Sequence, residues 1–319
     1  MQTSHSLKAY LALAAVCLFW GTTYLAIRVG IESMPPFLFA GIRFLLAGAL
    51  ICGFFIMKKT LWPRLIEWKQ IVIVSILFFV IGNTSVVQAE KHISSGLAAL
   101  ICSAIPIWVV LINMIKDRSE KINYWVISGL IIGFAGLMMI FYDNIGDLSN
   151  PGYLLSIIFL LFGNLTWSYG TVYSKNIKWT TPLLFAAGLQ MAVAGIILTI
   201  IGVVKGEMPD FKPDTNGLLS LLYLAGIGSV LTYGAYLFAL SKLPSTVVSL
   251  YAYVNPVVAV VLGWLILREQ FGIFTLIAMG ITLAGVYIVN VGFNRKKQNN
   301  QVDVKEKSGE IAKVLSVRH

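Results

Sequence analysis

The chain has 319 residues, of which 58% are hydrophobic and only 12% are charged, and its mean hydropathy is +0.82. These charged residues are too few to cover the surface of a water-soluble globular protein of this length. The composition therefore excludes a soluble globular protein and indicates a membrane protein. We attribute the formal net charge of +10 to topology signals in loops, and expect no nucleic-acid partner.

Ten apolar stretches follow one another along the chain, each long enough to cross about 30 Å of hydrocarbon as a helix. The sequence therefore predicts an all-α polytopic membrane protein. The first stretch has no small-residue cleavage site after it, so we predict a retained helix and not a signal peptide. The predicted spans are 9–29, 36–57, 70–89, 96–115, 124–141, 152–174, 182–204, 217–240, 246–267 and 273–292, followed by a polar, basic tail at 293–319.

The stretch 18–48 recurs without a gap 147 residues further on. Seven of its positions are identical, where apolar composition alone gives roughly three. Further identities follow at an offset of about 150, which predicts a duplicated unit. The identical pairs include Leu18 and Leu165, Trp20 and Trp167, Pro35 and Pro182, Gly41 and Gly188, Gly48 and Gly195, Ser95 and Ser245, and Pro106 and Pro256.

The two units, 9–141 and 152–292, each hold five predicted spans. An odd number of spans makes the second unit enter the membrane from the opposite face, so the two repeats are predicted to be inverted. Inverted repeats around a site at the membrane midplane are a recurrent design for alternating access. Lys and Arg residues place the N- and C-termini in the cytoplasm, with 18 of 24 on that side and five on the other.

Three segments carry a family resemblance: FWGTTYLAIR near the start, AEKHISSGLAALICSAIP in the middle, and VSLYAYVNPVVAVVLGWLILRE in the second half. They resemble the EamA-type transporters of the drug/metabolite transporter superfamily over residues 9 to 292. The resemblance implies ten helices in two inverted five-helix repeats, a bacterial inner-membrane location, and efflux of amino acids or other small metabolites.

Aromatic and polar residues concentrate in several predicted spans. Trp20 with Tyr24, and Tyr251 with Asn255, are spaced i,i+4 and so share a helical face. A cavity lined in this way can stack a small solute and hydrogen-bond its polar groups, although helix packing is the common use of such residues. The candidate substrate-binding residues are Trp20, Tyr24, Arg43, Asn83, Gln88, Trp167, Tyr233, Tyr251 and Asn255.

Arg43 is the only charged residue deep within a predicted span. Such a residue is costly in lipid unless it faces protein or water. It serves either as an anchor for a substrate carboxylate or as a structural bracket on helix-end carbonyls. Its repeat position holds Gln190, which favours the structural role.

Pro106 and Pro256 lie about ten residues into the fourth and ninth spans, near the midplane. A proline cannot donate to the carbonyl four residues before it, so each is predicted to bend its helix and free the carbonyls of Cys102 and Ala252. We predict either a symmetric pair of gating bends or two static kinks.

No enzyme site, metal site or cofactor site is predicted. The three histidines form no HExxH motif, and no glycine-rich phosphate loop is present. The three cysteines are far apart inside apolar runs. A channel or receptor, or a membrane enzyme, remains an alternative class. Glycine and alanine spacing in the fifth and tenth spans suits close helix packing and a possible homodimer.

The expected substrate is a small neutral, zwitterionic or carboxylate-bearing metabolite, because no acidic residue lies within a span to bind a cation. The same absence predicts downhill exchange over proton-coupled antiport. Glu90 and His92 sit at the outer mouth of the third span, where we expect water to surround both.

Overall fold

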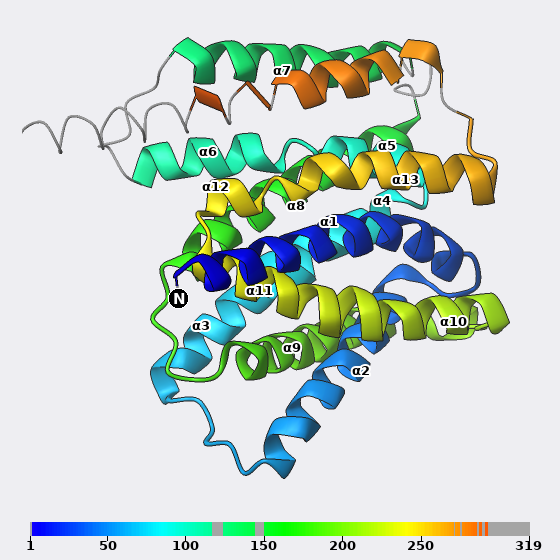
Figure 1. Cartoon of the computed structure of the whole chain (residues 1–319). Helices are drawn as coiled ribbons and strands as arrows, with labels where there is room; N and C mark the ends of the chain where they lie inside the picture. Colours follow the sequence, from blue (N-terminus) through cyan, green and yellow to red (C-terminus); the bar gives the residue numbers. More distant parts are fainter. Residues whose placement is uncertain are drawn as a thin grey trace, which may run out of the picture.

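The computed structural model describes residues 2–116, 124–143, 150–270, 272–274, 276–285, 287–288 and 291–292 (Figure 1). These residues are helical, with short connections and no strand among them. The predicted tail 293–319 and Glu120 lie outside the described residues. The prediction of an all-helical polytopic protein is confirmed.

The helices fall into runs that correspond to single membrane spans. Several spans are divided into shorter helices, including two π-helices, η1 and η4. The elements are α1 (Gln2–Ser33), α2 (Pro36–Met57), α3 (Leu65–Ser75), η1 (Ile76–Asn83), α4 (Thr84–Ala89), α5 (Ser95–Cys102), α6 (Ile105–Lys116), α7 (Tyr124–Asp143), α8 (Pro151–Lys175), α9 (Leu183–Val204), η3 (Met208–Asp210), α10 (Thr215–Tyr223), η4 (Leu224–Leu231), α11 (Thr232–Lys242), α12 (Ser245–Val248) and α13 (Tyr251–Leu267).

Eight segments of the described chain are long and apolar enough to cross a membrane. They match the first to fourth and the sixth to ninth predicted spans, and each end falls within five residues of its predicted position. The segments are Leu7–Ser33, Pro36–Met57, Leu65–Ala89, Ser95–Lys116, Pro151–Lys175, Leu183–Val204, Thr215–Lys242 and Ser245–Leu267. The fifth and tenth predicted spans fall on α7 and on a shorter apolar helix, Leu276–Gly285.

The helices begin where local chemistry satisfies their first N–H groups. Pro36 and Pro151 occupy first-turn positions, where the missing N–H costs nothing. Asn150 accepts a hydrogen bond from the Gly152 N–H at 2.9 Å, and Asp214 accepts one from the Gly217 N–H at 2.7 Å. These caps set where α8 and α10 start.

The repeated glycines bring α2 and α9 into close contact, the most extensive between any two helices in the described part of the chain. A Cβ atom added at Gly48 would lie 2.7 Å from the backbone nitrogen of Ala192, and one at Gly195 would lie 2.6 Å from that of Leu45. Only glycine permits backbones to approach this closely. The glycine identities between the two halves therefore reflect a helix pair that the halves share.

The two halves of the chain exchange their first helices. In the first half, α1 packs against α11 and α13 of the second half. In the second half, α8 packs against η1, α4 and α6 of the first half. The core is therefore formed jointly, with α1 near the middle of the bundle in Figure 1.

The helix α7 and the segment Leu276–Gly285 form the upper edge of the bundle in Figure 1. Their small residues meet each other, because a Cβ atom added at Gly136 would lie 2.4 Å from Thr282 Oγ1 and one at Gly285 would lie 2.2 Å from the Gly133 nitrogen. The small-residue spacing predicted for these spans is thus used within the chain. It does not by itself support a homodimer.

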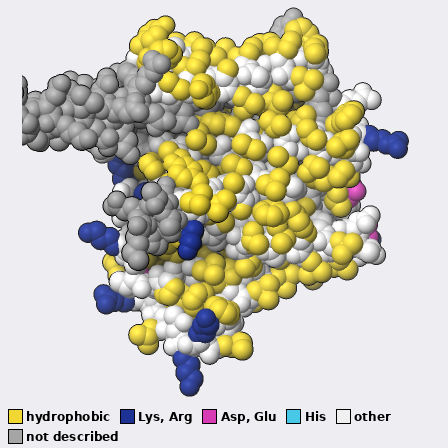
Figure 2. Space-filling view, in the orientation of Figure 1, with side chains coloured by type: hydrophobic (Ala, Val, Ile, Leu, Met, Phe, Trp, Pro, Cys, Tyr) yellow, Lys and Arg dark blue, Asp and Glu magenta, His cyan; other side chains and the backbone are white. Residues whose placement is uncertain are grey.

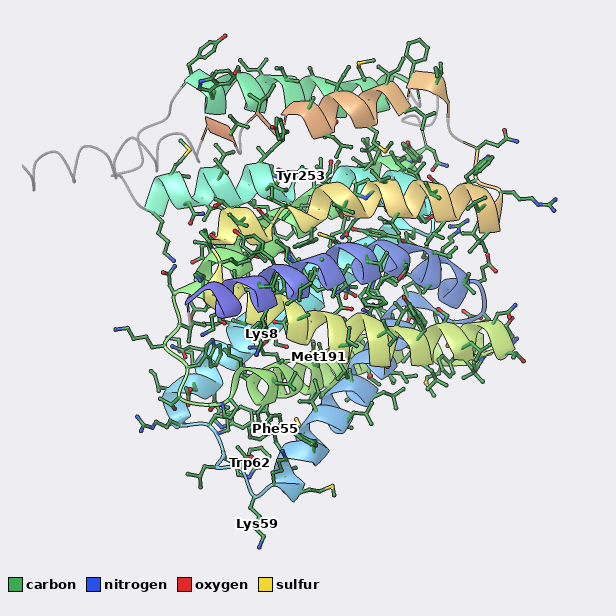
Figure 3. All side chains as sticks on the ribbon, in the orientation of Figure 1. Lys8, Phe55, Lys59, Trp62, Met191 and Tyr253 are labelled. Atoms are coloured by element: carbon green, nitrogen blue, oxygen red, sulfur yellow. The ribbon has the colours of Figure 1, made fainter. Side chains whose placement is uncertain are left out.

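Apolar side chains cover the visible face of the bundle, and lysine and arginine gather mainly along its left and lower edges (Figure 2). Near the lower corner, Phe55 and Trp62 lie close together beside the exposed loop that carries Lys59 (Figure 3). Phe55 stacks on Phe185 with ring centroids 5.2 Å apart, and Trp62 stacks on Trp68 at 6.3 Å. This aromatic cluster closes the end of α2.

Candidate functional site

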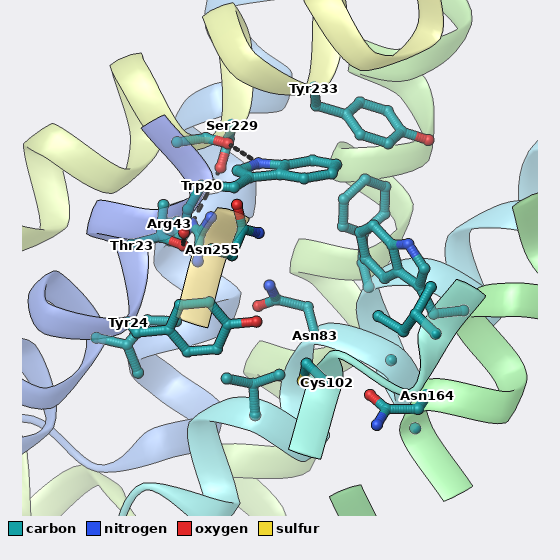
Figure 4. Close-up of a pocket in the computed structure, with 18 of the residues that line it drawn as sticks. Trp20, Thr23, Tyr24, Arg43, Asn83, Cys102, Asn164, Ser229, Tyr233 and Asn255 are labelled. Carbon is teal, nitrogen blue, oxygen red and sulfur yellow. Dashed lines mark hydrogen bonds between the residues drawn. The ribbon is translucent and has the colours of Figure 1, made fainter. Parts of the chain in front are cut away.

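A cavity of about 70 Å³ lies inside the bundle, where helices from both halves converge (Figure 4). This volume holds a few water molecules or a small solute. The lining residues are Trp20, Thr23, Tyr24, Ile27, Arg43, Phe44, Phe79, Gly82, Asn83, Val86, Cys102, Ile105, Gly163, Asn164, Trp167, Met191, Gly228, Ser229, Tyr233, Tyr251 and Asn255.

The structure brings eight of the nine candidate binding residues to this cavity. They are Trp20, Tyr24, Arg43, Asn83, Trp167, Tyr233, Tyr251 and Asn255. Gln88 is half-buried in α4 and is not among the residues that line the cavity. Pro106 and Pro256 do not line it either, but both follow helix breaks beside it.

Aromatic rings form one wall of the cavity. Trp20 is at its centre, with Trp167 at 5.5 Å, Tyr251 at 4.9 Å and Tyr236 at 5.1 Å between ring centroids. The contacts with Trp167 and Tyr251 are edge-to-face, a geometry that aromatic quadrupoles favour. Tyr236 supports this wall from behind, since it is fully buried and its hydroxyl lies 2.7 Å from Thr171 Oγ1.

The polar groups of the cavity are largely fixed by backbone carbonyls. The Trp20 Nε1–H donates to the Gly228 carbonyl at 3.0 Å, and Asn164 Nδ2 donates to the Ile101 carbonyl at 3.0 Å. The Asn255 amide, oriented to satisfy both groups, donates to the carbonyls of Tyr251 at 3.0 Å and Cys17 at 2.9 Å. These bonds hold the wall in place before any solute enters.

Arg43 extends from α2 to the cavity and is only 3% exposed. Its Nε donates to Ser229 Oγ at 3.0 Å, and its guanidinium carbon lies 5.0 Å from the centre of the Phe44 ring. The Nη1 atom is buried and finds no hydrogen-bond partner in the described part of the chain. None of the residues placed around the cavity is acidic. The cavity therefore holds an uncompensated positive group.

Gln190, at the repeat position of Arg43, makes different contacts. Its side-chain oxygen accepts from the Tyr233 hydroxyl at 2.8 Å, and its backbone carbonyl accepts from Ser75 Oγ at 2.7 Å. The sequence reasoning used Gln190 to favour a structural role for Arg43. The structure shows instead that the two positions differ, since Arg43 Nη1 has no partner among the described residues, whereas the Gln190 side chain is bonded to Tyr233.

Two π-helices border the cavity, and the sequence analysis did not predict them. η1 and η4 occupy equivalent places in the third and eighth spans, 148 residues apart. Each is followed by a threonine whose hydroxyl donates to the carbonyl five residues earlier: Thr84 to Phe79 at 3.0 Å and Thr232 to Ile227 at 2.6 Å. A widened turn changes which carbonyls are free, and Trp20 bonds one of them in η4.

The fourth and ninth spans are each broken ahead of the proline, two residues before Pro106 and six residues before Pro256. α5 ends at Cys102 and α6 begins at Ile105, while α12 ends at Val248 and α13 begins at Tyr251. The breaks fall on the turns at 103–104 and 249–250, whereas Pro256 lies inside α13. A bend at each proline stays a prediction. Pro106 stands in the first turn of the new helix, where a proline is readily accommodated.

Several lining residues were missed by the sequence reasoning. Thr23, Cys102, Asn164, Met191 and Ser229 all face the cavity. Asn164 alone carried a signal, since an amide in the middle of an apolar span needs a partner inside the protein. The small hydroxyl groups of Thr23 and Ser229 resemble ordinary helix-packing residues in sequence.

Glu90 overturns one expectation. It follows α4 at the predicted outer mouth, yet it is 0% exposed, and neither carboxyl oxygen has a hydrogen-bond partner in the described residues. The prediction that water surrounds Glu90 is wrong, although His92 is exposed as expected. Burial and the neighbouring Glu269 charge raise the pKa of Glu90 well above its usual range, and Arg28 opposes them only in part.

Comparison with known proteins follows the same division of the chain. The model of the EamA-like transporter family matches it twice, at residues 7–142 and 154–291. The uncharacterized inner membrane transporter YedA of Escherichia coli K12 is 33% identical over 295 residues, which cover 92% of this chain and 94% of YedA. The uncharacterized transporter YoaV of Bacillus subtilis is 25% identical over 291 residues, or 91% of this chain and 99% of YoaV.

A solved crystal structure superposes on this one with a TM-score of 0.67 and covers 90% of this chain and 98% of its own. At 17% identity this likeness shows the fold alone. This likeness in fold agrees with the spanning helices and with the family match. The chain is therefore a multi-pass membrane transporter that belongs to the EamA-like transporter family.

Proposed function

We propose that this transporter exports small metabolites that carry a carboxylate, with amino acids as the leading case, across the bacterial inner membrane by alternating access. The observation that carries the proposal is the unpaired Nη1 of Arg43 in a cavity without acidic residues. A buried guanidinium is costly until an anion pairs with it, and a carboxylate matches its geometry. The aromatic wall around Trp20 suits the apolar part of the same solute.

Paired features of the two halves support ten spans in two inverted repeats. Both third spans contain a π-helix, both fourth spans are broken before a proline, and both first helices pack into the opposite half. We place Pro106 and Pro256 at gates, because each break lies beside the cavity and allows the outer part of its span to tilt.

The proposed orientation places both termini in the cytoplasm. The basic edge seen in Figure 2 supports it. Cysteines introduced for the exposed Lys59 and Lys205 test it by labelling with an impermeant maleimide in right-side-out vesicles. We expect labelling at Lys205→Cys only, and labelling of both from one side contradicts the topology and the inversion together.

Binding tests the role of Arg43. Purified transporter is titrated calorimetrically with an amino-acid panel and with the corresponding amino-acid amides, which lack the carboxylate. We expect the acids to bind and the amides to fail. Arg43→Gln should weaken binding about tenfold to hundredfold, the worth of a charge-assisted hydrogen bond, and Arg43→Lys should recover only part of it. Lys58→Gln, at an exposed basic residue, is the matched control.

The alternatives predict different results in these assays. A channel or receptor does not support saturable counterflow in proteoliposomes, whereas an alternating-access carrier does. An exporter of cationic drugs needs an acidic partner in its cavity. Tight binding of a quaternary ammonium compound, unaffected by Arg43→Gln, therefore overturns the proposed substrate class.

A further inference from the structure

Glu90 lies at a junction of several elements. It ends the third span, and its backbone carbonyl accepts a hydrogen bond from Arg28 Nη1 of α1. Its carboxyl oxygens are buried without a partner in the described residues. An ionised carboxylate in this environment has lost its water and gained no donor, so the protonated form is the one that fits.

The carboxylate of Glu269, in contrast, has several hydrogen-bond donors. It accepts from the Ser95 N–H at 3.0 Å, from Ser95 Oγ at 2.9 Å and 3.0 Å, and from the Gly96 N–H at 3.4 Å. These donors at the start of α5 stabilise a negative charge. A second carboxylate charge near Glu269 is unfavourable. The Glu269 carboxylate has donors and the Glu90 carboxyl has none, so a protonated Glu90 fits this arrangement.

The groups that act on Glu90 come from three packed elements. Arg28 and Tyr24 belong to α1, Cys102 to α5, and Glu269 follows α13. Tyr24 and Cys102 both line the cavity, and each interacts electrostatically with Glu90. The Glu90 carboxyl is thus electrostatically coupled to the proposed substrate site.

We propose that Glu90 is the proton-binding group of the transport cycle and that its end of the bundle closes only after Glu90 has taken a proton from water. The inference rests on the proposed alternating-access export. When the cavity opens at the opposite end, the proton passes past Tyr24 to water in the cavity and Glu90 regains its charge. One proton then crosses inward for each cycle that exports a metabolite.

This inference replaces the prediction of downhill exchange. That prediction assumed that water keeps Glu90 ionised, and the burial of Glu90 removes the assumption. Arg28 has a place in the same cycle. Its guanidinium already lies against the Glu90 backbone, so it is within reach of the carboxylate once the proton has left.

A test that needs no substrate uses Cys102, the cavity thiol beside Tyr24. In a Cys17→Ser, Cys52→Ser background, spheroplasts are treated with an impermeant maleimide at a series of external pH values, with labelling normalised to the denatured protein. We expect Cys102 to be protected at low pH and labelled several-fold more as the pH rises. Glu90→Gln should stay protected throughout, and the exposed neighbour His92→Gln should behave like the parent.

The sign of the Glu90→Gln result separates gating from simple electrostatics. Removing a negative charge beside Cys102 favours its thiolate, so an electrostatic effect alone would increase labelling. A parent protein whose labelling does not change with pH overturns the inference, and this result does not depend on whether Glu90→Gln folds. The inference is also overturned if the Glu90→Gln protein is labelled at Cys102 as readily as the parent at high pH.

A second measurement tests coupling. Proteoliposomes are loaded with a labelled amino-acid mixture and assayed for counterflow and for accumulation driven by a pH gradient. We expect the gradient to drive accumulation in the parent and in His92→Gln, and both counterflow and accumulation to be lost in Glu90→Gln, because its Glu90 end stays closed. Counterflow without any gradient-driven accumulation in the parent overturns the proton role. Absence of counterflow in the parent contradicts the proposed substrate, while the Cys102 result still decides the role of Glu90.

Discussion

The indole rings of Trp20 and Trp167, which hold the same position in the two halves of the sequence, meet edge to face with centroids 5.5 Å apart. Their environments nevertheless differ. The Trp20 Nε1–H donates to the Gly228 carbonyl in η4, so Trp20 ties the first helix to a π-helix of the other half. The relationship gives the cavity a rigid aromatic centre built from both repeats.

Replacing Trp20 tests that link. Trp20→Phe keeps a ring but removes the donor, and it leaves the buried Gly228 carbonyl without its partner. We expect a loss of about 1–3 kcal/mol in the free energy of unfolding, measured by denaturation in detergent. Trp264→Phe changes a tryptophan that is 64% exposed, so it should alter stability by less than about 0.5 kcal/mol. Equal effects of the two variants would contradict the assignment.

Close packing of α2 and α9 predicts a second contrast. Gly48→Ala places a methyl group 2.7 Å from the Ala192 nitrogen, so the helices must separate, at about 1–3 kcal/mol. Gly53 lies on the same helix with nothing within 4 Å. Gly53→Ala should therefore be neutral or gain up to about 1 kcal/mol from helix propensity. The test is a comparison of melting temperatures: Gly48→Ala should melt below the parent, and Gly53→Ala should not.

Glu67 provides a third prediction, which concerns a contact between α3 in the first half and the residues before α9 in the second half. Its carboxylate accepts from the backbone N–H groups of Thr180 at 2.7 Å and Thr181 at 3.1 Å, and from their hydroxyls at 2.8 Å and 3.1 Å. Glu67→Ala removes the acceptor for all four donors before α9 and should cost about 2 kcal/mol or more. The exposed Glu32→Ala is the control, and a similar loss there would count against this role.

A fourth prediction concerns pH. The pKa of Glu90 is raised by burial and by Glu269, so its contribution to stability is present below the ordinary glutamate range and is lost as pH rises through the raised value. Thermal stability of the parent should therefore fall with increasing pH over that interval, and Glu90→Gln should flatten the profile. A parent profile identical to that of Glu90→Gln would remove the basis for a buried, protonated Glu90.

The two charged neighbours should move the pH transition of Cys102 labelling in opposite directions. Arg28 favours the ionised form of Glu90, so Arg28→Gln should shift the transition to higher pH. Glu269 disfavours it, so Glu269→Gln should shift the transition to lower pH. Shifts in the same direction would indicate a general loss of structure and would contradict the electrostatic argument.

Much of the fold followed from simple physics. Lipid requires long apolar helices, so eight spans could be located within a few residues, and the repeated Trp20, Gly48 and Pro106 identified elements that the halves share. The cavity residues were found because aromatic and amide groups at mid-span need partners inside the protein. Orientation, inversion and the roles of these residues remain predictions with the tests given above.

Other features depend on tertiary contacts that a linear pattern does not contain. η1 and η4 have ordinary apolar sequences, and their wide turns depend on a threonine bonding five residues back and on the helices packed around them. Glu90 is buried where the first half meets the second, in a region where α1, α5 and α13 pack on one another. At the end of a span, sequence alone assigns such a carboxylate to water.

The exchange of first helices between the halves affects how the protein is made. Trp20 reaches the membrane early in synthesis, but its partner Gly228 lies 208 residues later in the chain. Until then α1 resides in lipid with its final contacts missing, and its hydroxyls are satisfied locally, as Thr23 Oγ1 donates to the Trp20 carbonyl at 2.6 Å. Because Tyr251 and Asn255 also line the cavity, the cavity is complete only after their helix, α13, has joined α1.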